Sequence, residues 1–228
     1  IFRDRRILIG YRNTIIYTVF GTLLAVFITV PAAYALSRKD FVGHVVLMRL
    51  MVFTMYFNGG MIPTYLVVKS LGLTDTPYVL IIMGSFSVFN LILCRTYFQN
   101  TIPKELQDAA EVDGCSTGRF FVSIVLPLSK AILAIMVLYY AVARWNSFFD
   151  ALIYVSKSEL YPLQLIMRDI LVQGQTLQAD VSDPQMIVEM QKISKTIKYG
   201  VIIVSSLPVL LMYPFVQKYF VKGVMIGS

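Results

Sequence analysis

The sequence is short of charged residues, which make up only 14% of its 228 positions. Soluble domains carry about 25% charged residues, so a water-soluble chain of this composition would have too few polar side chains to cover its surface. Hydrophobic residues account for 57% of the sequence, and the mean hydropathy is +0.70. The composition therefore predicts an integral membrane protein, with lipid as the solvent for the apolar excess.

Histidine and cysteine are also scarce, with one His and two Cys in the whole sequence. Cys94 and Cys115 make at most one pair, which is no disulfide framework, and no cluster has the spacing of metal ligands. The sequence has no Gly-x-x-x-x-Gly-Lys-Ser/Thr phosphate loop and no nucleophile–base arrangement around His44. We therefore expect no catalytic residue, no metal site and no cofactor bound by this chain.

Acidic residues are outnumbered, with 13 Asp and Glu against 20 Lys and Arg, so the net charge is +7. No basic stripe sits on a soluble module, and nucleic acid is therefore not an expected partner. Basic loops instead mark the cytoplasmic side of membrane proteins. The short loop at 37–44 and the longer loop at 95–130 are accordingly assigned to the cytoplasm.

Five apolar segments approach or exceed the roughly 20 residues that a helix needs to cross the hydrocarbon core. They are 14–36, 45–68, 78–94, 131–155 and 199–216. The predicted fold is an all-α, polytopic transmembrane helical bundle that forms a single domain over 1–228. Five crossings place the N-terminus outside despite its arginines, so we expect a sixth span upstream in the parent protein. Segment 156–198 is then an extracytoplasmic loop, with a turn and helix start at 180–184.

The most informative stretch lies between the third and fourth segments. It has Asp-Ala-Ala at 108–110, then Gly114, Ile124 and Leu-Pro at 126–127. This stretch resembles the EAA motif in permeases of binding-protein-dependent ABC importers, which is Glu-Ala-Ala, three residues, Gly, nine residues, Ile, one residue, Leu-Pro. Every spacing matches, and the one departure is Asp108 in place of Glu, which keeps the charge on a shorter side chain.

The residues around the motif predict a short helix that ends at Gly114 in the left-handed conformation. Thr101 is placed to cap this helix, and Pro103 suits its first turn. A helix of about 11 residues is too short to be stable alone in water, so it must dock on another surface. A helix lying on the membrane is disfavoured because the polar face is acidic rather than basic. A second short helix is predicted from residue 116 or 117 to a position before Pro127.

The resemblance implies a division of labour with other proteins. In this family the spans form the type I importer fold, and the helix before the Gly inserts into a groove of a cytoplasmic ATPase. The implied partners are an ATPase dimer that uses ATP and Mg, a second permease subunit in a hetero-dimer, and an extracytoplasmic solute-binding protein. The loop at 99–127 is then the coupling loop. Its coupling residues are Glu105, Asp108, Ala109, Ala110, Glu111, Asp113, Gly114 and Pro127.

Other segments resemble the carbohydrate-uptake (maltose-type) branch of this family. They include Ala-Ala-Tyr-Ala-Leu-Ser-Arg at 32–38, Asn-Gly-Gly-Met-Ile-Pro-Thr-Tyr at 58–65, Tyr-Pro-Leu-Gln at 161–164 and the tail at 219–227. The combination is most similar to LplC-type permeases, a group linked to oligosaccharide import in Gram-positive bacteria. The resemblance spans nearly the whole chain and implies a sugar or oligosaccharide importer in the plasma membrane of a bacterium.

Polar and aromatic residues in the spans are candidates for the substrate path, since polar groups are costly in lipid and usually face protein or water. The candidates are Asn58, Asn90, Tyr139, Trp145, Asn146 and Asp150. Tyr139, Asn146 and Asp150 share one face of the fourth segment at helical spacing, where they either bind sugar hydroxyls or lie at the outer interface. The tryptophan either stacks on a sugar or anchors the interface. The Asn-Gly-Gly sequence at 58–60 forms either a broken helix that lines the path or a site where helices pack closely, and Asn90 is either a ligand or an interhelical hydrogen-bond donor.

A stand-alone secondary transporter or channel for a small polar solute is the competing hypothesis. The motif in the loop argues against it, as does the lack of a visible inverted repeat. A membrane enzyme is disfavoured by the missing nucleophile and metal arrangements. The sequence therefore favours a permease subunit that depends on a separate ATPase.

Overall fold

The computed structural model describes residues 5–179, 199–200, 202–203, 206 and 210. Within these residues every regular element is helical, which confirms the predicted all-α class. The elements are α1 (Arg5–Ser37), α2 (His44–Tyr56), α3 (Met61–Ser70), α4 (Pro77–Ile82), α5 (Val88–Thr101), α6 (Lys104–Val112), α7 (Thr117–Phe120), the π-helical turn η1 (Phe121–Val125), α8 (Leu126–Leu128), α9 (Lys130–Trp145), α10 (Phe149–Tyr154), the 3₁₀ turn η2 (Ser158–Leu160) and α11 (Leu163–Ala179). Most of the fifth predicted span and the helix start predicted at 180–184 lie outside the described residues.

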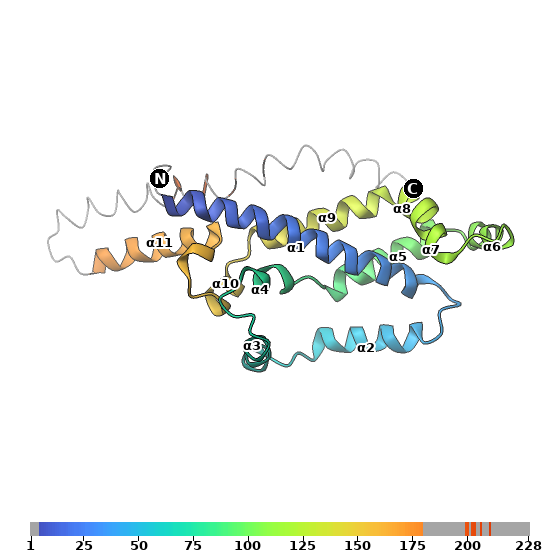
Figure 1. Ribbon diagram of the computed structural model, residues 1–228, viewed down its shortest axis with the longest axis horizontal. Coiled ribbons are helices and arrows are strands. Elements are labelled where there is room, and N and C mark those ends of the chain that lie inside the picture. Colours follow the sequence, from blue (N-terminus) through green and yellow to red (C-terminus); the bar gives the residue numbers. More distant parts are fainter. Residues whose placement is uncertain (1–4, 180–198, 201, 204–205, 207–209, 211–228) are drawn as a thin grey trace.

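Helix α1 is the axis around which the other helices pack (Figure 1). It has 33 residues and is long and apolar enough to cross a membrane alone, as predicted for the first segment. Its buried face carries small or hydroxyl-bearing residues such as Gly21, Ala25 and Thr29, which let neighbouring backbones approach closely. On its exposed side, residues such as Phe27 are open, as expected for a surface that meets lipid or another apolar chain.

The second predicted span is a bent pair of helices rather than one rod. Helices α2 and α3 are inclined at 112° across the break at 57–60. Gly60 has a φ of 85°, which favours glycine, and its N–H donates to Asn58 Oδ1 at 2.6 Å. The Asn-Gly-Gly sequence therefore forms a local turn that ends α2 and redirects the chain into α3.

The third and fourth predicted spans are also interrupted. Helix α4 stops at Ile82 and α5 starts at Val88, while α9 stops at Trp145 and α10 starts at Phe149. Among the described residues one helix qualifies as a membrane span alone, or up to three if each bent pair counts as one span. The five-span count stays a prediction. The predicted outer loop at 156–198 contains the 17-residue helix α11, whose packing against α1 the sequence did not reveal.

Buried apolar residues form three clusters along α1. The first joins the C-terminal half of α1 to α5 and α9, with Tyr34, Phe98 and Met136 among its members. The second joins α4 and α10 and includes Val79 and Tyr154. The third packs the N-terminal end of α1 against α11. The bundle is therefore not one uniform core, and α1 is common to all three clusters.

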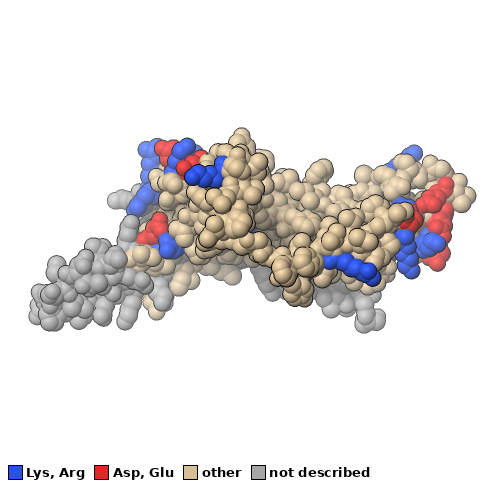
Figure 2. All heavy atoms as spheres, turned by 90° about the horizontal axis from the view of Figure 1, so that it is seen from below, with Lys and Arg blue, Asp and Glu red and all other residues tan. Residues whose placement is uncertain are grey.

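Charged side chains gather at the two ends of the molecule. On the face shown in Figure 2, acidic and basic groups lie at the end that carries α6 and at the opposite end, while the surface between them is mostly uncharged. The charged ends flank an apolar middle, as a bilayer requires. That the loop after α5 and the start of α1 lie on opposite sides of a membrane stays a prediction.

Candidate functional site

Helix α6 carries most of the predicted coupling residues at one end of the molecule (Figure 1). It runs over Lys104–Val112 and is shorter than predicted. Thr101, predicted as its N-cap, is instead the last residue of α5, and Pro103 takes the N-cap position. The reason is steric, because a proline disfavours the helical conformation of the residue before it, and Ile102 is accordingly extended. The prediction of the cap was therefore wrong.

The end of α6 is built as predicted, with Gly114 in the left-handed conformation at a φ of 71°. Its N–H donates to the carbonyl of Glu111 at 3.0 Å, and the N–H of Cys115 donates to that of Ala110 at 2.8 Å. Together these bonds make a Schellman motif and satisfy carbonyls that a helix end leaves free. A Cβ at Gly114 would meet no atom within 4 Å, so the backbone angle rather than crowding accounts for the glycine.

One face of α6 is packed and the other is open. Ala110 is only 8% exposed and, with Leu106, packs on the first apolar cluster. The open face carries most of the predicted coupling residues, namely Glu105, Asp108, Ala109, Glu111, Asp113 and Gly114. Val112 lies beside them and is 87% exposed. Of the two alanines, Ala109 is therefore available to a partner, while Ala110 lets α6 sit close to the bundle. An acidic face with small and apolar residues suits a partner with a basic groove.

An arginine links α6 to the end of α1. Arg38 lies just beyond α1, and its Nη2 contacts Glu111 Oε1 at 3.3 Å, while its Nε donates to Asp40 Oδ1 at 3.0 Å. Hydrogen bonds from Arg38 lower the pKa of Asp40, and the bond to Asp40 raises the pKa of Arg38. The groups are therefore charged at neutral pH. The sequence placed Arg38 in a basic loop but gave no sign of this contact.

After Gly114 the chain returns toward the bundle through α7, η1 and α8. Ser116 Oγ accepts a hydrogen bond from the N–H of Arg119 at 3.4 Å, so the second helix starts where predicted. It does not stop before Pro127, which lies inside α8. The π-helical turn that precedes α8 changes the hydrogen-bond register and allows the chain to stay helical there. The helical segment 117–128 then meets α9 at an angle of 82°.

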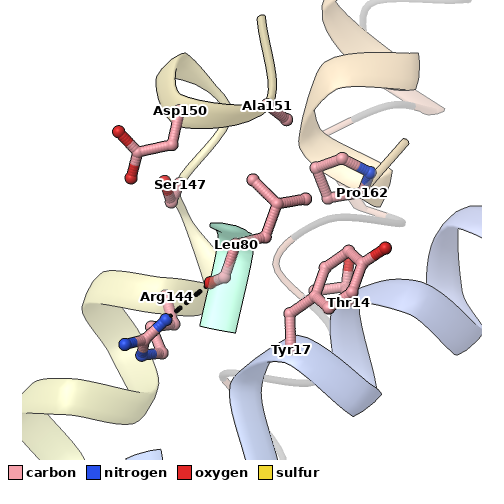
Figure 3. Close-up of a pocket in the computed structure, with 8 residues that line it drawn as sticks. All are labelled: Thr14, Tyr17, Leu80, Arg144, Ser147, Asp150, Ala151 and Pro162. Atoms are coloured by element: carbon pink, nitrogen blue, oxygen red, sulfur yellow. Dashed lines mark hydrogen bonds between the residues drawn. The ribbon is translucent and has the colours of Figure 1, made fainter. Parts of the chain in front are cut away.

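A second polar cluster lies inside the bundle, where α1, α4, α9 and α10 meet (Figure 3). Arg144 of α9 donates through Nη1 to the carbonyl of Leu80 and through Nη2 to that of Ile81, both at 2.8 Å. Nη2 also contacts Ser85 Oγ at 2.8 Å. These acceptors lie at and just beyond the end of α4, where carbonyls lack helical partners and the helix dipole is negative. Arg144 therefore caps α4 from another helix.

A small cavity of about 30 Å³ adjoins this cluster. Its lining includes Thr14 and Tyr17 from α1, Ser147 from the break after α9, and Asp150 from α10 (Figure 3). The volume holds a water molecule rather than a sugar ring. The cluster is thus a polar junction between helices in this conformation.

The predicted path residues on the fourth segment do not share one continuous helix. Helix α9 ends at Trp145, Asn146 is its C-cap, and Asp150 belongs to α10. Because α9 is interrupted, Asn146 and Asp150 are not successive turns of one face, and that part of the prediction was wrong. Asp150 borders the cavity, whereas Asn146 and Tyr139 are exposed. Contact with substrate stays a prediction for all three.

The remaining path candidates lie in different places. Trp145 is 6% exposed and packs in the third cluster with Ile7 and Leu163, between α1 and α11. Asn90 is buried near the start of α5. Asn58 is exposed in the turn between α2 and α3. The structure does not bring the six candidates together into one site.

A contact that the sequence did not predict joins α1 to the Tyr-Pro-Leu-Gln segment. Asn13 Nδ2 donates to the carbonyls of Glu159 at 2.7 Å and Tyr161 at 3.1 Å. The N–H of Leu163 donates to Thr14 Oγ1 at 2.8 Å, which starts α11 against α1. The available signal was an amide and a hydroxyl next to each other at the start of an apolar segment. Such residues are costly in lipid unless another part of the chain satisfies them.

Comparisons with known proteins agree with this geometry. The family model described as "Binding-protein-dependent transport system inner membrane component" matches residues 7–226. The polygalacturonan/rhamnogalacturonan transport system permease protein YtcP of Bacillus subtilis (strain 168) is 45% identical over 215 residues, which cover 94% of this chain and 74% of that protein. Protein LplC of the same organism is 43% identical over 222 residues, covering 94% and 72%. A crystal structure of a bacterial ABC transporter involved in the import of the acidic polysaccharide alginate has a chain that is similar with a TM-score of 0.83 and 33% identity, over 96% of this chain and 77% of that one.

Proposed function

We propose, from the premise that this chain belongs to the family of binding-protein-dependent transport system inner membrane components, that it forms half of a translocation path for an oligosaccharide. The chain is a permease subunit of an ABC importer and is not itself an enzyme. Membership of this family implies a membrane location and, in general terms, a partner permease, an ATPase and a solute-binding protein.

The observation that carries the proposal is the open, acidic face of α6 at one charged end of the molecule. This face carries Asp108 and ends at the left-handed Gly114, at the spacing of the EAA motif. The helix is anchored to the bundle through Ala110 and, at the end of α1, through Arg38. A force that a partner exerts on the open face therefore acts on α6, a short helix that is fixed to the longer helices of the bundle. This arrangement suits transmission of a rigid-body movement.

The proposed partners are those that membership of the family implies. A cytoplasmic ATPase dimer that uses ATP and Mg would receive α6 in a groove with basic residues. A second, non-identical permease subunit would complete the path, and helix α2, none of whose residues is buried in this chain, offers apolar surface to it or to lipid. A solute-binding protein would deliver the substrate at the end where α1 begins. The location is the plasma membrane of a bacterium.

The substrate class is supported by the similar proteins. The name of YtcP refers to transport of polygalacturonan and rhamnogalacturonan, and the similar crystal structure comes from an importer of alginate. We therefore propose a sugar oligomer. A complex reconstituted in liposomes with its binding protein should show ATP hydrolysis that rises with one class in a panel of neutral and acidic oligosaccharides.

The coupling role is tested by charge reversal at Asp108, which is exposed on α6. Asp108→Lys should weaken co-purification of the ATPase and reduce uptake of labelled oligosaccharide, because it turns an attraction to a basic groove into repulsion. Asp108→Asn is the matched control of similar size and should have a smaller effect. Normal partner binding and uptake in Asp108→Lys would contradict the proposal. Uptake by this chain without any ATPase would favour a stand-alone transporter or channel instead.

A further inference from the structure

Two interrupted helices have their breaks next to each other. Helix α4 ends at Ile82, ahead of α5, and α9 ends at Trp145, ahead of α10. Arg144 lies in the last turn of α9, and its guanidinium group reaches the carbonyls of Leu80 and Ile81 in the last turn of α4. The two breaks are therefore connected by one side chain.

The short helices α4 and α10 belong together. The N–H of Asp75, just before α4, donates to the carbonyl of Tyr154 at the end of α10 at 2.9 Å. Asp75 Oδ1 accepts hydrogen bonds from the N–H groups of Ser156 and Lys157. Val79 and Tyr154 also share the second apolar cluster. We call α4, α10 and the Asp75 contacts the outer unit.

Helices α5 and α9 form a separate body. Leu91 of α5 and Met136 of α9 are fully buried in the first cluster, which contains no residue of α4 or α10. We call α5 and α9 the inner unit. This unit is joined to the coupling end, because α9 follows directly on α8 and η1. Arg144 of the inner unit makes charged hydrogen bonds to the outer unit, and its side chain is partly buried.

The space around Arg144 is shaped for a guanidinium group. A Cβ added at Gly21 of α1 would overlap it, and the three nearest atoms to that Cβ all belong to Arg144. Nε of Arg144 is buried and has no acceptor among the described protein atoms. Arg144 also lines the small cavity that Asp150 borders (Figure 3). Arg144 is thus held by the end of α4, and it fills the space above Gly21 of α1.

We propose that Arg144 is the positioning residue at a joint between the inner and outer units, and that it passes movement of α9 to α4 and α10 during transport. The proposal rests on the proposed importer function. The physical reason is that a partly buried cation leaves its acceptors only at a cost in free energy, since an unpaired charge away from water is unfavourable. When the coupling end moves α9, the end of α4 must follow, and the Asp75 contacts carry α10 with it.

The test uses the reconstituted complex with its ATPase and binding protein. Arg144→Leu removes the link, and Gly21→Ala displaces the guanidinium group without removing its charge. Both should lower the ratio of substrate-stimulated to basal ATP hydrolysis by about tenfold or more, as expected for loss of a buried charged hydrogen bond. Arg144→Lys keeps the charge and should retain part of the stimulation. Leu23→Ala, at an exposed position of α1, is the matched control and should leave the ratio unchanged.

A double substitution separates a joint from a general packing role. Since the three nearest atoms to a Cβ at position 21 all belong to the guanidinium group, Gly21→Ala should have little further effect in an Arg144→Leu background. Additive losses would show that Gly21→Ala acts elsewhere and would overturn the proposal. So would a normal ratio in assembled single variants, or failure of Arg144→Leu, Gly21→Ala and Arg144→Lys alike to assemble. Normal co-purification of the ATPase with these variants, together with its loss in Asp108→Lys, keeps this test distinct from that of the proposed function.

Discussion

Substitution of Gly114 should weaken coupling in proportion to the strain that it places on the end of α6. The φ of Gly114 is 71°, in the region where an L-residue costs roughly 1–2 kcal/mol. A Cβ there has open space within the chain, so no clash with the permease adds to this cost. Gly114→Ala should therefore be impaired, Gly114→Val more so because it is β-branched, and Gly114→Asn least because Asn tolerates this conformation.

The magnitude follows from the population of the docking-competent helix end. A strain of about 1–2 kcal/mol lowers the folded-to-unfolded ratio of that end by about 5- to 30-fold. Once the docking-competent end of α6 is no longer the dominant conformation, the apparent dissociation constant of the ATPase rises. The rise is in inverse proportion to the fraction of permease molecules that still have this end. Losses well above 30-fold for Gly114→Val would indicate an additional clash with the partner.

The assay is the affinity of the purified ATPase for the permease complex in nanodiscs, measured beside substrate-stimulated ATP hydrolysis. Gly118 provides a matched control, because it lies four positions later, also has open space around its Cβ site, and sits in α7 without a positive φ. Gly118→Ala should be neutral or slightly stabilising, since alanine favours a helix over glycine by about 1 kcal/mol. Equal affinities for Gly114→Val, Gly114→Ala and the unsubstituted protein would refute the reasoning.

Three further predictions concern orientation, the link at the end of α1, and the substrate path. A membrane-impermeant thiol reagent applied to intact cells should label neither cysteine, since Cys115 belongs to the cytoplasmic end and Cys94 is buried; strong outside labelling of Cys115 would reverse the orientation. Asp40→Asn should lower the free energy of unfolding by no more than about 1 kcal/mol at neutral pH, because Asp40 is exposed, and the difference should shrink as the pH falls through the lowered pKa of Asp40; a loss that does not change with pH would disprove the ionic link. Replacing Asn146 and Asp150 together with Leu should reduce oligosaccharide uptake while assembly is kept, and unchanged uptake would remove both from the path.

The sequence predicted those features that depend on local chemistry. Gly114 ends α6, Ser116 starts the next helix, and α1 has the length and composition of a membrane span, because caps, glycine conformation and hydropathy act over a few residues. Thr101 failed as a cap because the effect of Pro103 on Ile102 was stronger than the capping preference. The break at Asn58 was anticipated from the Asn-Gly-Gly sequence, whereas the breaks after Ile82 and Trp145 were missed, since hydropathy reports burial in lipid and not the continuity of a helix.

The parts of the candidate site that depend on tertiary contacts could not be predicted in this way. The role of Arg144 is set by carbonyls of α4, some 60 residues away along the chain. Within the sequence, Arg144 is only a charged residue in the apolar segment 131–155. Likewise, the contacts of Asn13 and Thr14 join residues far apart in the sequence, on α1 and on the segment that leads into α11. They can be recognised only in the folded structure. A polar residue in an apolar segment indicates that a partner exists but does not identify it.

The difference between α1 and the other helices indicates which parts of the permease move. Helix α1 is unbroken over 33 residues, contacts the outer unit, the inner unit and α11, and ends at the Arg38 contact with α6. Helices that are divided into short pieces can change their relative angle at the breaks, whereas an unbroken helix moves as one body. We therefore expect α1 to move as one body with α6, which is fixed to it through Arg38, while the outer unit changes its angle to α1 at the breaks that Arg144 connects.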